Sequence, residues 1–155
     1  MLKKRIIPTM LWNGKTLVKG KKFINDRKTG SPITTIQIYN ARDVDEIFFL
    51  NISPYKRVDK SFYSELTSHC NVPITIGGGI ESIKSISDLL ECGADKISIN
   101  SAAFSKKNLI ESAAKYFGSQ TIVVSLDYKM IKNIPYCFTH LGKKNQKFNL
   151  HDACK

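Results

Sequence analysis

Residues 72–101 alternate short apolar runs with one segment of helical periodicity. Residues 72–76 are apolar and mostly β-branched, and they end at the triple glycine 77–79, which is typical of a buried parallel strand. A helix from about 82 to 92 follows, because its apolar residues recur every three or four positions: Ile80, Ile83, Ile86, Leu89 and Leu90. Residues 96–100 follow as a second strand. The stretch therefore predicts one βαβ unit with a right-handed crossover.

The same alternation continues along the chain and predicts the other elements. Further strands are expected at 4–11, 46–52, 121–126 and 136–139. Further helices are expected at about 31–41, 62–68 and 108–117, with a last one capped by Asn149. Residues 20–30 are predicted to be a basic loop. Apolar strands that alternate with amphipathic helices indicate an α/β protein with a parallel sheet.

An internal repeat points to the kind of sheet. Val44–Phe49 and Ala94–Ile99 share the frame small-Asp-charged-Ile, about fifty positions apart. Repeated βα pairs of this kind suggest a (β/α)₈ barrel built by duplication. About four and a half βα units are present, whereas a closed barrel takes roughly 200 residues or more. We therefore expect residues 1–155 to form either a single partial (β/α)₈ (TIM) barrel domain or an open sheet.

Composition removes several classes of function. The net charge of +11 is compatible with a polyanion surface, but the lysines are scattered and form no basic stripe interleaved with aromatic residues. No nucleic-acid partner is therefore expected. No apolar run approaches the roughly 20 residues of a membrane span, so no membrane is expected and the cytoplasm is the predicted location. The four cysteines are widely spaced, which favours reduced thiols over a metal site or a disulfide framework.

The triple glycine is the first candidate for chemistry. A glycine turn between a parallel strand and a helix lets the backbone approach a ligand and directs free N–H groups at it, which suits a phosphate. A tight turn without a ligand explains the same residues.

Many short motifs in one order carry a resemblance to a known family. KRIIP, LVKG, VDEIFFL, VPITIGGGI, GADKISIN and FGSQTIVVSLD resemble the synthase (cyclase) subunit of imidazole glycerol phosphate synthase. The resemblance runs from Met1 to about Asp152 and covers the first half of that barrel. It implies a subunit that receives ammonia from a glutaminase partner and uses it to open and cyclise a phosphorylated nucleotide in histidine biosynthesis, with no cofactor and no metal.

The resemblance matches only one of the family's two catalytic positions. The family uses two aspartates, at the carboxyl ends of its first and fifth strands, as general acid and base. The second is present as Asp127, which is therefore the catalytic candidate; a capping aspartate at a strand end is the structural alternative. At the first position the chain has Leu11, which cannot transfer a proton. Asn51 likewise stands where the family usually has an aspartate.

The substrate-binding positions match the family better. Gly78 and Gly79 in the glycine turn, together with Asn100 and Ser101, correspond to its phosphate contacts. Lys19 is kept in the loop after the first strand. The resemblance therefore implies that these residues bind a phosphorylated substrate.

The resemblance also assigns residues at the amino ends of the strands. In the family, ammonia enters past a ring of charged residues, three of which match Arg5, Glu46 and Lys96. Asp95 matches a residue that contacts the glutaminase. Charged residues buried at separate strand starts must pair with one another, so a salt-bridge plug that only closes the barrel is the alternative to an ammonia gate.

Three functions remain open from the sequence. Leu11 and Asn51 favour a paralogue that delivers ammonia to a sugar in surface-polysaccharide biosynthesis, with a phosphorylated small molecule or a nucleotide sugar as substrate. The histidine-pathway cyclase is the second hypothesis, and a non-catalytic fragment is the third. An open half-barrel is also expected to dimerise or to pair with a separate carboxyl-terminal half. His140, His151 and Trp12 receive no role.

Overall fold

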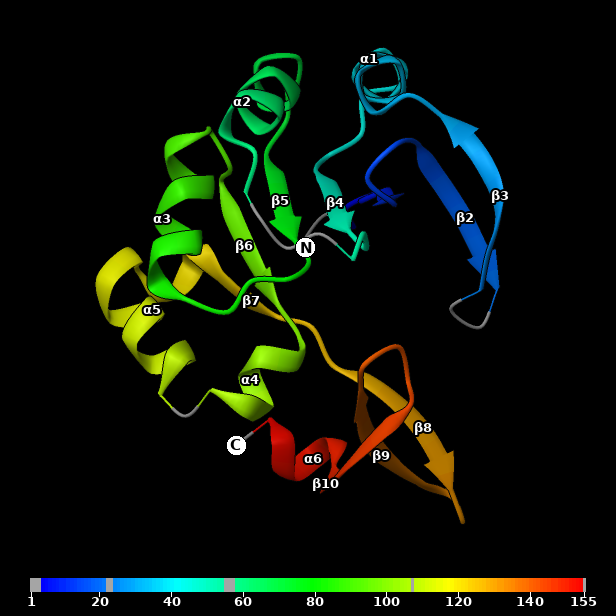
Figure 1. Ribbon diagram of the computed structural model, residues 1–155, viewed down its shortest axis with the longest axis vertical. Coiled ribbons are helices and arrows are strands. Elements are labelled where there is room, and N and C mark those ends of the chain that lie inside the picture. The colour runs from blue at the N-terminus through cyan, green and yellow to red at the C-terminus, as the bar shows by residue number, and fades with distance from the viewer. Residues whose placement is uncertain (1–3, 22–23, 55–57, 107, 155) are drawn as a thin grey trace.

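The computed structural model describes residues 4–21, 24–54, 58–106 and 108–154 (Figure 1). Seven strands of these residues form one sheet in the order β3-β2-β1-β4-β5-β6-β7. They are β1 (Thr9–Trp12), β2 (Leu17–Lys21), β3 (Ile24–Gly30), β4 (Ile47–Asn51), β5 (Ile74–Gly77), β6 (Lys96–Ile99) and β7 (Ile122–Val124). Strands β1, β4, β5, β6 and β7 run parallel, and β2 and β3 form an antiparallel hairpin beside β1.

Helices follow the parallel strands and lie along the outer side of the curved sheet (Figure 1). They are α1 (Pro32–Asn40), α2 (Lys60–Ser68), α3 (Ile83–Glu91) and α5 (Leu109–Phe117), with a 3₁₀ turn η1 (Ser119–Thr121) before β7. In the part of the chain that the structure describes, no helix has the length and apolarity needed to cross a membrane. This arrangement is a partial (β/α)₈ barrel, as the sequence predicted.

The strand register explains where the core lies. Five apolar residues stand at one level across the parallel strands and pack towards the helices: Met10, Phe49, Ile76, Ile97 and Ile122. The helices meet them with Ile36, Leu66, Ile86, Leu89 and Ala113, all buried. Because side chains alternate along a strand, the next level points to the opposite, inner face of the sheet: Leu11, Leu50, Gly77, Ser98 and Val123.

Local sequence sets the helix boundaries close to their predicted places. Ser82 caps α3 by accepting from the backbone N–H of Ser85, whose hydroxyl faces the Ser82 backbone N–H in return. Such a capping box satisfies two amides that the first helical turn leaves free. Asp59 caps α2 in the same way, through Phe62. The predicted helix at 82–92 is therefore confirmed.

Two predictions for the first thirty residues need correction. The first strand was expected at 4–11, but β1 begins at Thr9, because Pro8 has no N–H for a ladder and contributes only its carbonyl, to Phe48. The described residues of the predicted basic loop at 20–30 belong to β2 and β3, which form a hairpin in which Lys19 pairs with Arg27; positions 22–23 lie outside the described residues. Leu17 and Val18 at the start of β2 are buried, whereas Lys19, Gly20 and residues 27–30 are exposed, so the composition of this part of the hairpin resembles that of a loop.

A second, three-stranded antiparallel sheet lies beyond β7 (Figure 1). It contains β8 (Asp127–Ile131), β9 (Ile134–Thr139) and β10 (Lys144–Asn149), and the short helices α4 (Ser101–Ser105) and α6 (Leu150–Ala153) lie beside it. The rings of Phe104 in α4 and Phe148 in β10 lie 6.3 Å apart. The sequence predicted β9 and α6 but neither β8, β10 nor α4.

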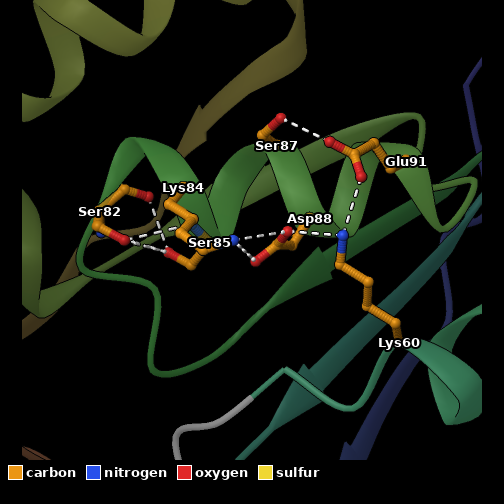
Figure 2. Close-up of polar contacts among 7 residues, drawn as sticks. All are labelled: Lys60, Ser82, Lys84, Ser85, Ser87, Asp88 and Glu91. Carbon is orange, nitrogen blue, oxygen red and sulfur yellow. Dashed lines mark hydrogen bonds and ion pairs between the residues drawn. The ribbon is translucent and has the colours of Figure 1, made fainter.

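Ion pairs join α2 to α3 on the outer surface (Figure 2). Lys60 Nζ lies 2.7 Å from Asp88 Oδ1 and 2.9 Å from Glu91 Oε2, and Lys84 pairs with Asp88 within α3. The bonds to Asp88 and Glu91 raise the pKa of Lys60 above its usual range. Exposed pairs of this kind contribute little to stability, so we assign this cluster to helix packing and not to the site.

Candidate functional site

The amino ends of four strands meet at one carboxylate. Glu46, the residue before β4, is only 4% exposed. Its Oε1 accepts a bond of 2.7 Å from Thr75 Oγ1, and its Oε2 lies 2.9 Å from Lys96 Nζ and 3.3 Å from Arg5 Nη1. The structure therefore brings the three gate candidates of the sequence together and adds Thr75, which the sequence analysis missed.

The charges around Glu46 decide its protonation. Burial by itself raises the pKa of a carboxyl group, but the bonds from Lys96 and Thr75 and the charges of Lys96 and Arg5 outweigh it. The pKa of Glu46 is therefore lowered from its ordinary value of 4.5. At neutral pH a buried anion lies between two cations, of which Arg5 is largely exposed and Lys96 about one quarter exposed.

The repeated aspartates have one structural role in both copies. Asp45 Oδ2 accepts from the backbone N–H of Ile6 at 2.7 Å, and Asp95 Oδ2 accepts from that of Ile74 at 2.8 Å. Each aspartate also donates its own backbone N–H to the carbonyl of the same residue. The frame found in the sequence thus ties the start of one strand to its neighbour. Asp95 remains exposed, as a contact with a partner requires.

The carboxyl ends of β6 and β7 bring a second polar group together. Asn100 Nδ2 donates to Asp127 Oδ2 at 3.3 Å, and Ser101 Oγ donates to Asn100 Oδ1 at 3.2 Å. Asp127 is half-buried at the start of β8. It lines a pocket of about 290 Å³ together with Leu126, Tyr128, Lys129, Phe138 and Gly142. Three candidates from the sequence therefore form one hydrogen-bonded chain.

Packing accounts for two of the three glycines. Gly78 has φ +102°, and a Cβ there would lie 1.9 Å from the carbonyl oxygen of Asn51. A Cβ on Gly77 would lie 2.7 Å from Leu50 Cδ2. Close backbone approach therefore requires both residues whether or not a ligand binds, which is the structural alternative that the sequence left open.

Register places the glycine turn beside Asn100. Gly77 pairs with Ser98 in parallel strands, so Gly79 and Asn100 each follow that pair by two residues at the same edge of the sheet. Gly79 is exposed, with φ +68°. Its position fits the predicted phosphate contact, and the phosphate itself remains a proposal.

Lys19 lies apart from this group. It stands exposed on β2 opposite Arg27. Within the described residues, no hydrogen bond or ion pair joins Lys19 to Asn100, Ser101 or Asp127.

The two departures from the family pattern have different surroundings. Asn51 is buried; its Nδ2 donates to Tyr63 Oη at 3.1 Å and its Oδ1 accepts from Ser53 N at 2.9 Å. The Asn51 side chain therefore connects the residues that directly follow β4 to helix α2. Leu11 pairs with Leu50 and Val18 and faces the inner side of the sheet. No carboxylate stands at its level across the parallel strands.

His140 is a neighbour of the site that sequence reasoning missed. Its backbone N–H donates to Ser101 Oγ over 3.5 Å, across 39 positions of the chain. No short-range pattern signals such a contact, because it depends on how the second sheet packs. No group of three or more His, Cys, Asp or Glu side chains in the described ranges could hold a metal ion.

Comparison with known proteins decides the family. The model of the family described as histidine biosynthesis protein matches residues 5–155. This chain belongs to that family.

Curated relatives show how similar this chain is to known proteins and how much of their length it covers. A putative imidazole glycerol phosphate synthase subunit hisF2 of Campylobacter jejuni is 43% identical over 155 residues, covering 99% of this chain and 62% of the relative. The imidazole glycerol phosphate synthase subunits HisF of Phocaeicola vulgatus and Flavobacterium johnsoniae are 37% and 41% identical, covering 100% and 98% of this chain and 63% and 62% of those proteins. The chain thus spans about three fifths of the length of these relatives.

Proposed function

We propose that this chain is the amino-terminal part of an ammonia-accepting synthase, the cyclase-type subunit of imidazole glycerol phosphate synthase. The names of its relatives support the histidine-pathway hypothesis more than the polysaccharide hypothesis favoured by the sequence alone. The observation that carries the proposal is the division of polar groups between the two ends of the parallel strands. A buried ion cluster lies at the amino ends, and the hydrogen-bonded series of Ser101, Asn100 and Asp127 lies at the carboxyl ends.

In this proposal the amino end handles ammonia. A glutaminase subunit supplies it near the exposed Asp95, and Arg5, Glu46 and Lys96 form the gate. Movement of one cation away from the Glu46 carboxylate opens a polar path between the strands. The exposure of Arg5, which is large, and of Lys96, which is about one quarter, supports this role, because either side chain can leave Glu46 and regain water.

The carboxyl end performs the reaction. Gly78, Gly79, Asn100 and Ser101 bind a phosphate of the substrate. Asp127 then accepts or donates the proton that moves as the carbon–nitrogen bond forms. Lys19 contacts the substrate phosphate only if the β2–β3 hairpin closes over the bound substrate.

A second candidate function rests on Leu11. A leucine in place of the first catalytic aspartate leaves proton transfer to Asp127, which favours a paralogue that aminates another acceptor, such as a sugar of a surface polysaccharide. The relative in Campylobacter jejuni is named a putative imidazole glycerol phosphate synthase subunit hisF2.

Exposed apolar residues next to the first and last parallel strands support a further partner. Ile6 is 70% exposed just before β1, and Val124 is 41% exposed at the end of β7. Val124 stands two residues after Ile122 and therefore lies on the helix-facing side of β7. We propose that further βα units cover them, from the same polypeptide, from a separate half-barrel or from a second copy. Light scattering on the purified protein distinguishes these sources by mass.

Turnover of the phosphorylated ribulosyl-imidazole nucleotide with ammonium as nitrogen source tests the proposed function. We expect turnover by the wild type and a loss of about 100-fold or more in Asp127→Asn, because general acid–base groups contribute that much. Product that appears only in Leu11→Asp would favour the sugar-modifying paralogue. No product from either protein, despite native folding, would favour the non-catalytic fragment.

A further inference from the structure

A turn of the second sheet contacts the candidate site. His140, Leu141 and Gly142, between β9 and β10, have φ values of +54°, +59° and +71°. Successive positive φ values are the ordinary geometry of a tight hairpin turn, and Lys132 and Asn133 between β8 and β9 also have them. The interest of the turn 140–142 therefore lies in its contacts.

The turn is held from within its own sheet. Lys129 Nζ donates to the carbonyl oxygen of Gly142 at 2.5 Å, and its ammonium lies 4.8 Å from the centre of the Phe138 ring. The backbone N–H of Lys143 donates to the carbonyl of Thr139 at 3.1 Å. These contacts fix the position of the turn relative to β8, the strand that begins at Asp127.

Buried Thr139 is the centre of a polar network. Its hydroxyl accepts from Gln146 Nε2 at 2.5 Å and lies 2.9 Å from His140 Nδ1. The Thr139 hydroxyl therefore bridges the side-chain amide of Gln146 and the imidazole ring of His140. Thr139 therefore fixes both the ring of His140 and the start of the turn.

The network continues to the catalytic candidate. The backbone N–H of His140 donates to Ser101 Oγ, so this hydroxyl directs its proton to Asn100 Oδ1. With its oxygen occupied, the Asn100 amide presents its nitrogen to Asp127 Oδ2. Ser101 and Asn100 each accept one bond and donate one, so the series runs in a single direction from the His140 N–H to the Asp127 carboxylate.

We propose that the turn 139–142 positions Asp127 through Ser101 and Asn100, and that Thr139 is its key positioning residue. This inference rests on the proposed function, since positioning matters for catalysis only if Asp127 transfers a proton there. It extends the site from the barrel strands to the second sheet.

Thr139→Val tests the proposal by removing the hydroxyl at nearly constant shape. Two measurements are made: the ¹⁵N–¹H signals of the Asn100 side-chain amide, and ammonium-dependent turnover. We expect the amide signals to move and kcat to fall about 10-fold, with KM within about twofold, because misplacing a catalytic group costs rate more than binding. Thr139→Ser should restore both. Thr121→Val, whose hydroxyl bonds Phe117 far from the turn, should change neither.

The two readouts separate this inference from the proposed function. A wild type without turnover contradicts the proposed function, while the Asn100 signals still decide whether the turn orients that amide. Unmoved Asn100 signals in folded Thr139→Val, or Thr139→Ser as impaired as Thr139→Val, would overturn the inference. If Thr139→Val does not fold, Gln146→Met is the second variant, because it removes the amide that donates to the Thr139 hydroxyl from a half-buried position. The signals of the Asn100 side-chain amide should then move by a smaller amount.

Discussion

The two ends of the parallel strands are organised in different ways. At the amino end, buried Glu46 accepts three bonds of 2.7–3.3 Å from side chains of neighbouring strands. At the carboxyl end, the bonds through Asn100 are 3.2 and 3.3 Å long, and the groups are partly exposed. Ion pairs thus hold the amino end together, whereas close backbone packing and a contact with the second sheet hold the carboxyl end.

This difference agrees with the proposed division between an ammonia gate at the amino end and a catalytic site at the carboxyl end. A charge cluster keeps its geometry until one ion moves, which suits a gate. A glycine turn held by close backbone contact leaves N–H groups free for a ligand, which suits a substrate site. Changes at the two ends are therefore expected to have different signatures.

Gly78→Ala should have the largest effect on stability and break the carboxyl end. The new Cβ would meet the Asn51 carbonyl at 1.9 Å, at a φ of +102° that favours glycine. We expect the free energy of unfolding to fall by about 3 kcal/mol, from strain and overpacking together. Urea unfolding followed by circular dichroism measures it.

Gly118→Ala is the matched control for that loss. Gly118 also has positive φ, at +89°, but a Cβ there would meet no atom closer than 3.9 Å. Its cost should be about 1–2 kcal/mol, from backbone strain alone. Equal losses in both variants would mean that the approach of Asn51 to Gly78 is unimportant.

Glu46→Gln should have the next largest effect, at the amino end. The neutral amide keeps the shape but leaves Lys96 and Arg5 without their anion. We expect a loss of about 2 kcal/mol, below the usual cost of breaking a buried pair because both cations reach water. Lys84→Met, which breaks an exposed pair on α3, should leave stability unchanged within error. If Glu46→Gln leaves the free energy of unfolding unchanged, the claim that charge organises the amino end is contradicted.

Acid should reduce the contribution of Glu46 selectively. Its folded pKa is lowered below 4.5, so its stabilisation is complete above about pH 4.5 and disappears as the pH falls through the lowered value. The stability difference between wild type and Glu46→Gln should therefore be constant from neutral pH to about pH 5 and shrink below pH 4.5. Urea unfolding at stepped pH measures it, and a difference that grows in acid would contradict it.

The amino end could be predicted from the sequence because its determinants are local and repeated. The small-Asp-charged-Ile frame places Asp45 and Asp95 at equivalent strand starts, where they make equivalent bonds to Ile6 and Ile74. Strands and helices with strong periodicity were found within a few residues for the same reason. Thr75 escaped notice, since nothing in a strand marks one threonine as the partner of a distant glutamate.

The carboxyl end could be predicted only in part. Its glycines and Asn100 follow a strand visibly, but the triple glycine serves packing as well as any ligand. The second sheet was missed because β8 and β10 expose most of their residues and so lack a clear apolar alternation. The contact of His140 with Ser101 depends on that sheet, so no sequence pattern indicated it.

The most direct test of the central claim compares two nitrogen sources. Turnover is measured with glutamine and the glutaminase subunit, and again with ammonium alone, for wild type, Lys96→Met and Asp127→Asn. The account predicts that Lys96→Met changes the ratio of glutamine-driven to ammonium-driven turnover, whereas Asp127→Asn lowers both rates equally. An unchanged ratio in Lys96→Met would contradict the assignment of ammonia entry to one end of the strands and chemistry to the other.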